Sequence, residues 1–282
     1  MIVIDYNGIA IAGVVVQKLE INEDLIRHMI LNSIRMYNKK FRSEYGQVVI
    51  ACDARTWRRD YFPNYKFKRR ENRDDSAADW DEIFRIINQV RDEIAQNFPY
   101  KVIHIDGCEA DDIIGALAYE TQEFGKHEPM MIVSSDKDFI QLQKFSNVKQ
   151  FSPMQKKAVT DKNPRHYLFE HILKGDSGDG VPNCLSPDNT FVDGIRQSPV
   201  TKKKIEHWLE HAEDLQSVMD ENTYRNYVRN KNLIDLSCTP SHIKEAIINK
   251  FEEDPIGLKR NVLNYLIKKR CKMLIECVEE FY

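Results

Sequence analysis

Residues 130–138 read Met130-Met131-Ile132-Val133-Ser134-Ser135-Asp136-Lys137-Asp138, a short apolar run that ends in polar and acidic residues. Such a run, bounded by polar residues, is typical of a strand buried in a sheet. Three other stretches follow the same pattern: Ile2–Ile4 leads into Asp5, Val48–Cys52 into Asp53, and Val102–Ile105 into Asp106. The sequence therefore predicts four buried strands, each followed by an acidic residue.

Segments with helical spacing lie between these strands. Apolar residues recur every three or four positions in residues 25–41, 80–94 and 113–124, and Asn22 is a candidate cap for the first of these segments. Strands that alternate with long helices are typical of a parallel sheet covered on both faces. We predict an α/β domain over residues 1–155, with a mostly parallel central sheet flanked by helices, and a smaller helical domain over residues 156–282.

Composition limits the class of protein. The 282 residues carry a formal net charge of −3, from 41 Lys and Arg against 44 Asp and Glu, which excludes a histone-like polycation. The longest apolar stretch, Ile9–Val16, is far shorter than the ~20 residues of a membrane helix. The six scattered cysteines and the lack of a secretion signal predict free thiols, no membrane partner and a reducing cytoplasm.

Carboxylates concentrate where the predicted strands end. They are Asp5, Asp53, Asp106, Glu109, Asp111, Asp112, Asp136 and Asp138. The carboxyl ends of parallel strands share one edge of a sheet, where ligands bind, so at least six of these groups should converge. Like charges this close require bound cations or strongly raised pKa values. Oxygen ligands without His or Cys suit Mg²⁺ or Mn²⁺, and paired ions of this kind cleave phosphodiesters. The pattern predicts a metal-dependent nuclease.

Each acid taken alone has a second explanation. Asp111, Asp112 and Asp138 fall in the first turns of predicted helices, where acids complement the helix dipole, and Asp136 could be an N-cap. A single Asp at a strand end also occurs in other α/β folds. Because four strands end in the same way, the metal site is the favoured interpretation.

A basic, aromatic segment follows Asp53. Residues 55–73 contain eight Lys or Arg against two acids, together with five aromatic residues. Interleaved cations and aromatic rings suit single-stranded nucleic acid, because the cations neutralise phosphates while the bases stack on the rings. A solvated connector would explain the charge alone. The segment leaves a strand at the edge that carries the acids, which favours a nucleic-acid contact.

Four motifs occur in a fixed order along the chain. They are Trp57-Arg58 with Tyr65-Lys66-x-x-Arg69, Glu109-x-Asp111-Asp112, Ser135-Asp136-x-Asp138, and Gly175-Asp176-x-x-Asp179-x-Val181-Pro182. Together they resemble the 5′ nuclease (flap endonuclease) family. Within that family, His28–Ile34, Asn147–Met154 and Ile172–Asp176 resemble the ribonuclease H enzymes of T-even bacteriophages. The resemblance spans essentially the whole chain and thins after about Pro182.

The resemblance implies a metal-site role for a defined set of acids. The set is Asp5, Asp53, Glu109, Asp111, Asp136 and Asp138, with Asp112 adjacent and Asp176 and Asp179 completing the shell of a second ion. The implied cofactors are two Mg²⁺ ions, which Mn²⁺ can replace. The implied catalytic residues are Asp111 and Asp136 with two cations, Lys66 and Arg69.

The resemblance also implies how nucleic acid is bound. Lys66 and Arg69 would lie on an arch, residues 55–75, where a cation stabilises charge on the scissile phosphate. Arg58 and Tyr65 would help to hold the strand. After Asp179 the chain departs from the Gly-x-Gly-x-Lys hairpin of cellular members. Duplex binding is therefore assigned to the basic run Lys202, Lys203 and Lys204.

The function implied by the family is that of a Mg²⁺-dependent 5′ to 3′ exonuclease and flap endonuclease that hydrolyses RNA primers and 5′ flaps on DNA during replication. The implied partners are branched DNA, RNA–DNA hybrid, a sliding clamp and a single-strand DNA-binding protein. The protein would be a monomer, in the cytoplasm of an infected host if phage-encoded. Two alternatives stay open: a PIN-type single-strand ribonuclease and a non-catalytic protein that binds forked DNA.

One further motif is His207-Trp208-Leu209-Glu210-His211, which matches the H-x-x-E-H pattern of inverted zinc proteases. Both histidines lie beside an apolar helix face, and the sequence indicates no third ligand. The motif therefore ranks well below the nuclease site.

Overall fold

The computed structural model describes residues 1–17, 21–76 and 78–282, and the chain forms two compact units. Unit 1 comprises Met1–Arg55, Asp79–Thr160 and Ser241–Tyr282, and unit 2 comprises Thr56–Ala78 and Asp161–Pro240. This division differs from the predicted boundary between residues 155 and 156. The physical reason is that Val262, Tyr265, Leu266 and Phe281 are buried in the same core as the first strand.

Unit 1 is built on a six-stranded sheet with the order β3-β2-β1-β4-β5-β6. The strands are β1 (Ile2–Asp5), β2 (Val48–Ala51), β3 (Lys101–Ile103), β4 (Met130–Val133), β5 (Val148–Ser152) and β6 (Lys157–Val159). The first five run parallel, and β6 pairs antiparallel with β5. The four predicted strands are confirmed, whereas β5 and β6 have no counterpart in the sequence prediction.

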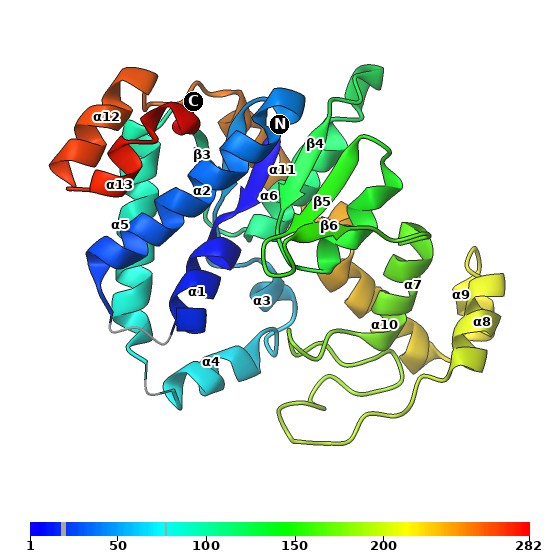
Figure 1. The fold of residues 1–282 in the computed structure, drawn as a ribbon. Coiled ribbons are helices and arrows are strands. Elements are labelled where there is room, and N and C mark those ends of the chain that lie inside the picture. Colours follow the sequence, from blue (N-terminus) through cyan, green and yellow to red (C-terminus); the bar gives the residue numbers. More distant parts are fainter. Residues whose placement is uncertain (18–20, 77) are drawn as a thin grey trace. The chain divides into compact units, whose positions relative to one another are not determined.

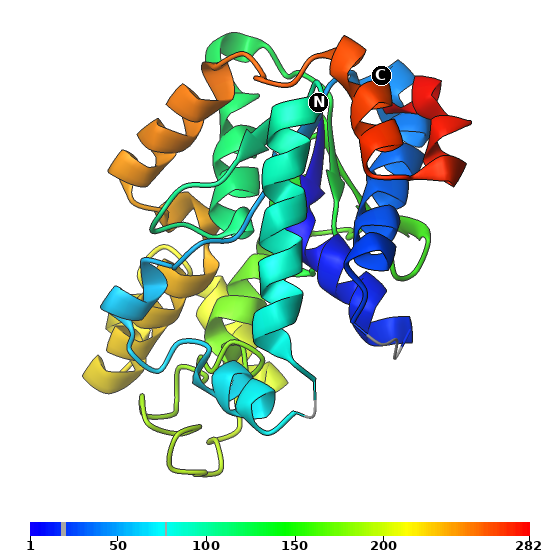
Figure 2. The same cartoon turned by 90° about the vertical axis from the view of Figure 1, so that its left-hand side faces the viewer.

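Helices cover both faces of the sheet (Figure 1). On one face lie α2 (Glu23–Tyr45) and α5 (Trp80–Asn97), with α1 (Tyr6–Gln17), α12 (Lys259–Lys268), α13 (Lys272–Ile275) and η4 (Val278–Phe281) packed beside them. The other face is covered by α6 (Ala110–Glu120) and α11 (Ser241–Glu252), and η1 (Glu123–Gly125) and η2 (Asp138–Lys144) are short 3₁₀ turns. Figure 2 shows both termini at the same end of this unit. The predicted mostly parallel α/β fold is confirmed.

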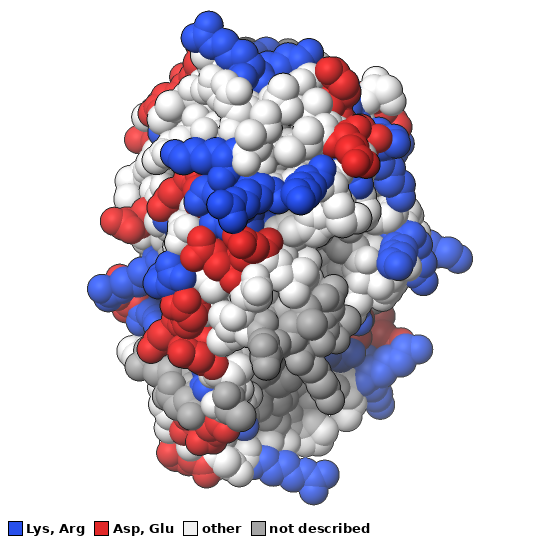
Figure 3. Space-filling view, turned by 60° about the vertical axis from the view of Figure 1, so that its left-hand side comes forward, with Lys and Arg blue, Asp and Glu red and all other residues white. Residues whose placement is uncertain are grey.

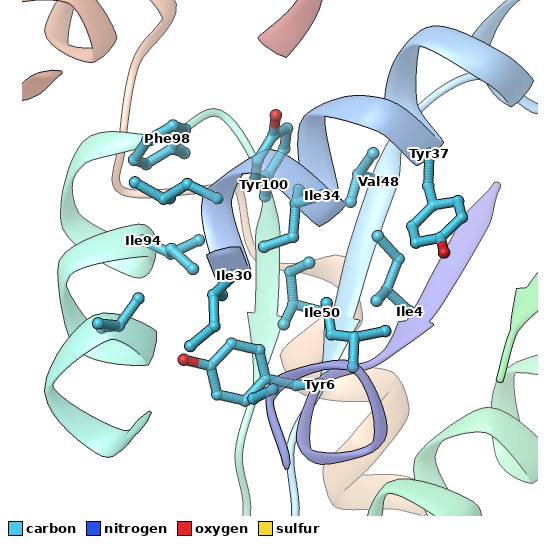
Figure 4. Packing of buried hydrophobic residues seen from close by; sticks show 14 of the residues in the cluster. Ile4, Tyr6, Ile30, Ile34, Tyr37, Val48, Ile50, Ile94, Phe98 and Tyr100 are labelled. Atoms are coloured by element: carbon cyan, nitrogen blue, oxygen red, sulfur yellow. The ribbon is translucent and has the colours of Figure 1, made fainter. Parts of the chain in front are cut away.

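The core beneath α2 and α5 is aliphatic and aromatic (Figure 4). Ile4 and Ile50 from the sheet, Ile34 from α2 and Ile94 from α5 are all fully buried. Helix α2 begins at the predicted cap, because Asn22 Oδ1 accepts a hydrogen bond of 3.0 Å from the Leu25 N–H. Burial of each such side chain contributes about 1.5–3 kcal/mol. This packing holds the central strands, and hence their carboxyl ends, in place.

An ion network joins α2, α5 and α12 within unit 1. Arg27, 1% exposed, donates from Nε to Glu93 at 2.8 Å. The Tyr265 hydroxyl donates to Glu93 at 2.7 Å, and Lys269 pairs with the same carboxylate. Burial alone would raise the pKa of Glu93, but hydrogen bonds from Arg27, Lys269 and Tyr265 outweigh it and lower the pKa to about 2. The network therefore anchors the last helices of the chain to α5.

Unit 2 is helical, as predicted for the region after residue 156. Its elements are α3 (Arg58–Tyr61), α4 (Phe67–Asp74), α7 (Pro164–Lys174), α8 (Lys202–Glu210), α9 (Leu215–Val218), α10 (Glu221–Ile234) and η3 (Leu236–Cys238). Phe62 and Tyr65 pack with Ile172 and Leu233 in one buried cluster. Residues of the predicted arch therefore contribute to the core of unit 2.

The surface carries charges of both signs. Figure 3 shows one face, on which Lys and Arg side chains are interspersed with Asp and Glu. This mixture agrees with the formal net charge of −3. The six cysteines are free, as predicted. In the part of the chain that the structure describes, no helix has the length and apolar character needed to cross a membrane.

Candidate metal centre

Acidic side chains end neighbouring strands in the middle of the sheet of unit 1. Asp5 is the last residue of β1, Asp53 follows β2, and Asp136 follows β4. Strand β1 lies between β2 and β4, and the three strands run parallel, so their acids emerge at one edge. The structure thus brings these three predicted residues together.

Asp5 lies at the centre of this group. The N–H of Gly8 donates to its Oδ1 at 2.9 Å, and the Ser134 hydroxyl donates to its Oδ2 at 2.8 Å. Removal from water and the negative charge of Asp53 raise the pKa of Asp5, the two hydrogen bonds lower it, Asp136 raises it further, and the net value is about 6. Burial is the largest cause of this shift, and the charges of Asp53 and Asp136 add to it; a divalent cation bound beside the three carboxylates would offset both.

Gly8 shapes the first turn of α1 around the Asp5 carboxylate. A Cβ atom at this position would lie 2.4 Å from Asp5 Oδ2, which is too close for any side chain. The turn therefore forms a cradle that only glycine permits. The sequence prediction does not include Gly8, although a glycine three residues after a strand-end Asp is the signal that could have revealed it.

Two polar side chains position the loop after β4. The Ser134 hydroxyl donates to Asp5 and accepts the N–H of Asp136 at 3.1 Å. The N–H of Asp138 donates to Asp136 Oδ1 at 2.9 Å. Gln150 of β5, 1% exposed, donates to the carbonyls of Ser134 at 3.1 Å and Asp136 at 2.5 Å. Ser134 and Gln150 are absent from the sequence prediction, and no local pattern indicates either, because β5 is itself rich in polar residues.

The acids at the start of α6 have two roles. Glu109 and Asp112 form a capping box, in which Asp112 Oδ2 accepts the N–H of Glu109 at 3.0 Å. Asp112 is completely buried and caps this helix, and its predicted place adjacent to the metal site stays a prediction. The N–H of Ala110 donates to Asp53 Oδ1 at 2.8 Å, which ties this turn to the end of β2. Asp111, in the same turn, is half-buried.

The predicted site residues of unit 2 gather around Asp179. The Tyr65 hydroxyl donates to Asp179 Oδ2 at 2.9 Å, and Lys66 Nζ lies 3.6 Å from the same oxygen. Arg69 pairs with Oδ1. Asp179 is 7% exposed, so its carboxylate is neutralised inside unit 2 by two cations that were predicted to contact phosphate. Asp176 Oδ1 accepts the N–H groups of Gly178 at 2.7 Å and Asp179 at 3.2 Å.

The residues predicted to bind nucleic acid differ in exposure. Arg58 is 2% exposed and donates from Nε to the Leu233 carbonyl at 2.8 Å, and Tyr65 is 4% exposed. In this structure both side chains support the packing of unit 2, and their predicted role in holding the strand stays a prediction. Lys202, Lys203 and Lys204 are exposed on the first turn of α8.

The donor set at the sheet edge fits hard divalent cations. Asp5, Asp53, Asp136 and their neighbours offer carboxylate oxygens, which Mg²⁺ and Mn²⁺ prefer over nitrogen or sulfur ligands. The cradle at Gly8 and the raised pKa of Asp5 are consistent with a site whose negative charge is balanced by bound cations.

Comparison with known proteins defines the class. The model of the 5′-3′ exonuclease N-terminal resolvase-like domain matches residues 9–168, and the model of the T4 RNase H C-terminal domain matches residues 164–281. The chain therefore belongs to the 5′-3′ exonuclease family. It is 33% identical to the ribonuclease H of Enterobacteria phage T4, over 99% of this chain and 94% of that protein. It is also 29% identical to a 5′-3′ exonuclease of Buchnera aphidicola, over 51% of this chain and 50% of that protein.

Solved structures of the bacteriophage T5 D15 protein share the fold. One, crystallised with metal ions, aligns with a TM-score of 0.58 at 15% identity and covers 99% of this chain and 98% of that chain. Another, a D15 flap endonuclease complex with DNA and metal ions, aligns with a TM-score of 0.58 at 16% identity, over 95% of this chain and 98% of that chain. The predicted resemblance to the 5′ nuclease family, and to the T-even phage enzymes within it, is confirmed.

Proposed function

We propose that this protein is a divalent-metal-dependent 5′ to 3′ exonuclease and flap endonuclease that hydrolyses RNA primers and 5′ flaps on DNA during replication. The observation that carries the proposal is the convergence of Asp5, Asp53 and Asp136 at one sheet edge, where the pKa of Asp5 is raised to about 6. The names of two relatives support the substrates: a ribonuclease H from phage T4 and a T5 flap endonuclease in complex with DNA.

Two Mg²⁺ ions, or Mn²⁺ in their place, would be held by the acids of unit 1. These ligands would be Asp5, Asp53, Glu109, Asp111, Asp136 and Asp138. By the family resemblance, Asp176 and Asp179 would complete the shell of the second ion. Bound ions of this kind activate water and neutralise charge on the phosphate during hydrolysis. Metal ions in the T5 structures support the need for a divalent cation.

Lys66 and Arg69 would bind the scissile phosphate. Both cations form ion pairs with Asp179, and these pairs would hold the two charged groups in position before substrate binds. An incoming phosphate competes with Asp179 for them, because phosphate oxygens accept strong charge-assisted hydrogen bonds from Lys and Arg. Their charge would then stabilise the transition state. The exposed Lys202, Lys203 and Lys204 would bind the duplex backbone.

The remaining proposals follow from the family resemblance. The protein would act as a monomer on branched DNA and RNA–DNA hybrid, with a sliding clamp and a single-strand DNA-binding protein as replisome partners. The cytoplasm of an infected bacterial host is the compartment that fits these partners.

Product mapping tests the proposal. Three substrates of matched sequence, a 5′-flap DNA, an RNA-primed DNA and a plain single-stranded RNA, are labelled at either end and incubated in Mg²⁺ or in chelator. We expect cleavage near the flap junction and stepwise loss of RNA from its 5′ end, in Mg²⁺ only. Faster cleavage of the plain RNA would favour the PIN-type ribonuclease. Fork binding without turnover in Mg²⁺ or Mn²⁺ would favour the non-catalytic alternative.

A further inference from the structure

A second group of metal-binding side chains lies on α8, within unit 2. His207 and Glu210 lie in the last turn of this helix, His211 is the residue that caps it, and all three are exposed. Residues at positions i, i+3 and i+4 share one helix face. The sequence indicated no third ligand for the histidine pair, and the structure supplies Glu210 as that ligand.

Packing fixes which face of α8 is turned outward. Ile205 and Trp208, each 5% exposed, are buried in a cluster with Leu173 and Leu215. The helix therefore cannot rotate without exposing this apolar surface. Its outward face keeps the two imidazoles and the carboxylate together in water, where a metal ion can reach them.

The three groups are close enough to share one ion. One ligand atom from each residue lies within 4.8 Å of the others, and the two imidazole centroids are 4.8 Å apart. A tetrahedral Zn²⁺ with bonds of about 2.0–2.1 Å places its ligand atoms about 3.4 Å from one another. To bind one Zn²⁺ ion, the ligand atoms of the three side chains must therefore move closer to one another by about 1 Å. Exposed side chains make that movement by rotation about their own bonds, with no repacking of the core.

A hydrogen bond prepares His211 as a ligand. Its Nδ1 lies 2.9 Å from the carbonyl oxygen of His207. A carbonyl can only accept, so Nδ1 carries the proton and Nε2 of the neutral ring keeps its lone pair for a metal. Metal-bound histidines commonly hold their second ring nitrogen in this way, because the contact fixes both the tautomer and the ring orientation.

The ligand chemistry selects an ion different from that of the strand-end site. Two imidazole nitrogens and one carboxylate suit Zn²⁺, Cu²⁺ or Ni²⁺, and they suit Mg²⁺ poorly. Glu210 offsets part of the ion's charge. Lys203, one turn before His207, carries a positive charge that repels a bound cation. The Lys203 side chain is exposed, so water and salt screen this repulsion.

We propose that His207, Glu210 and His211 form a binding site for a late first-row divalent metal, with Zn²⁺ as its ion. Three protein ligands leave one position of a tetrahedral ion open for water or for a donor from another molecule. Ion binding joins residues 207 and 211 and so fastens the C-terminal turn of α8. The site is separate in chemistry from the proposed nuclease centre and does not depend on it.

Metal titration of the full chain tests the site. Protein freed of metal with chelator is titrated with Zn²⁺ by calorimetry in excess Mg²⁺, which occupies the carboxylate site, and with Cu²⁺ by electron paramagnetic resonance. We expect the wild type to bind one Zn²⁺ equivalent that Mg²⁺ does not displace and that adds to any Zn²⁺ taken up by the carboxylates, and to give a Cu²⁺ signal with hyperfine coupling to two nitrogens. The double variant His207→Gln/His211→Gln should lose both. The control His242→Gln, at an exposed histidine on α11, should keep both.

Two further readouts make the result decisive. Circular dichroism and thermal melting establish that the double variant is folded, and Glu210→Gln should weaken Zn²⁺ binding while the two-nitrogen Cu²⁺ signal remains. Flap cleavage in Mg²⁺ should be unchanged in the double variant. Equal Zn²⁺ stoichiometry in the wild type and the double variant, or a Cu²⁺ signal without nitrogen coupling, would overturn the proposal.

Discussion

The first turn of α1 leaves no space for one additional carbon atom beside Asp5. In Gly8→Ala the new Cβ would lie 2.4 Å from Asp5 Oδ2, so the carboxylate must move. We expect Mn²⁺ affinity and flap cleavage to fall by roughly 10-fold or more, since displaced support of a metal ligand has effects of this size. Mn²⁺ binding, followed by electron paramagnetic resonance, measures the change.

A matched control lies in the same helix. In Gly13→Ala the new Cβ would lie 2.7 Å from the terminal methyl of Met29, which can move aside. This variant should bind Mn²⁺ as the wild type does. Equal loss in both variants would mean that α1 as a whole, and not the cradle at Gly8, controls the site.

The pKa of Asp5 predicts a pH dependence of stability. The folded state holds this proton up to a pKa of about 6, whereas the reference value is 3.8. Without metal, the free energy of unfolding should therefore fall as pH rises from about 4 to 6, by up to about 3 kcal/mol. Asp5→Asn should be more stable than the wild type at pH 8 but not at pH 4. Urea unfolding in chelator measures this, and a difference that is the same at both pH values would contradict the pKa assignment.

Lys66 is a residue at which charge and backbone geometry can be separated. It has φ 57° and ψ 25°, a left-handed conformation that costs a non-glycine residue about 1 kcal/mol. Lys66→Gly and Lys66→Ala should both reduce flap cleavage, because both remove the cation. Lys66→Gly should be the more stable by about 1 kcal/mol, measured by urea unfolding. Retained cleavage in either variant would exclude Lys66 from phosphate binding.

At the residue scale, sequence patterns predicted the acids near strand ends but not the contacts between residues that are distant in sequence. The strand-end acids could be predicted because each lies within a few residues of the end of a buried run. The pairing of Asp179 with Lys66 and Arg69, and the contact of Ser134 with Asp5, join residues more than one hundred positions apart. Local spacing contains no information about such contacts, so they required the structure.

At the scale of elements, Glu93 holds three helices together. Its pKa of about 2 lies below the reference value of 4.5, so its contribution to stability is complete above pH 4.5 and is lost as pH falls toward 2. Glu93→Gln should lower the free energy of unfolding at pH 7 by about 3 kcal/mol. Glu82→Gln is the control in the same helix and should cost much less, because the ion pair that Glu82 forms with Arg85 is in contact with solvent. Similar losses in both would show that the buried network adds no stability.

Two elements illustrate the limits of local patterns. Helix α1 contains several β-branched residues, among them Ile9, Ile11 and Val14, which on propensity alone favour a strand, yet the segment is helical and the helix contacts α2. Strand β5 contains the polar residues Lys149 and Gln150 and lacks a continuous apolar run. In both cases tertiary contacts decide the conformation, whereas β1, β2 and β4 are apolar enough to be recognised from sequence.

At the scale of the whole molecule, the helical spacing of apolar residues predicted that the C-terminal region is helical, but not which core its helices pack against. Residues 241–282 are helical as expected, but they pack into unit 1 through Tyr265, Lys269 and Phe281, while residues 56–78 join unit 2. Periodicity identifies the apolar face of a helix and leaves open which surface covers it. The order of segments along the chain therefore does not predict which of the two units each segment belongs to.

The central claim is that the strand-end carboxylates of unit 1 bind the ions that cleave nucleic acid. Asp136→Asn tests it most directly, with Asp106→Asn as the control, because Asp106 also follows a strand but has an exposed side chain outside the network around Asp5. The measurement is single-turnover cleavage of a 5′-labelled flap in Mg²⁺, with thermal melting to establish folding. We predict that Asp136→Asn loses at least roughly 100-fold in rate while Asp106→Asn stays within about twofold of the wild type. Wild-type cleavage by folded Asp136→Asn would contradict the account.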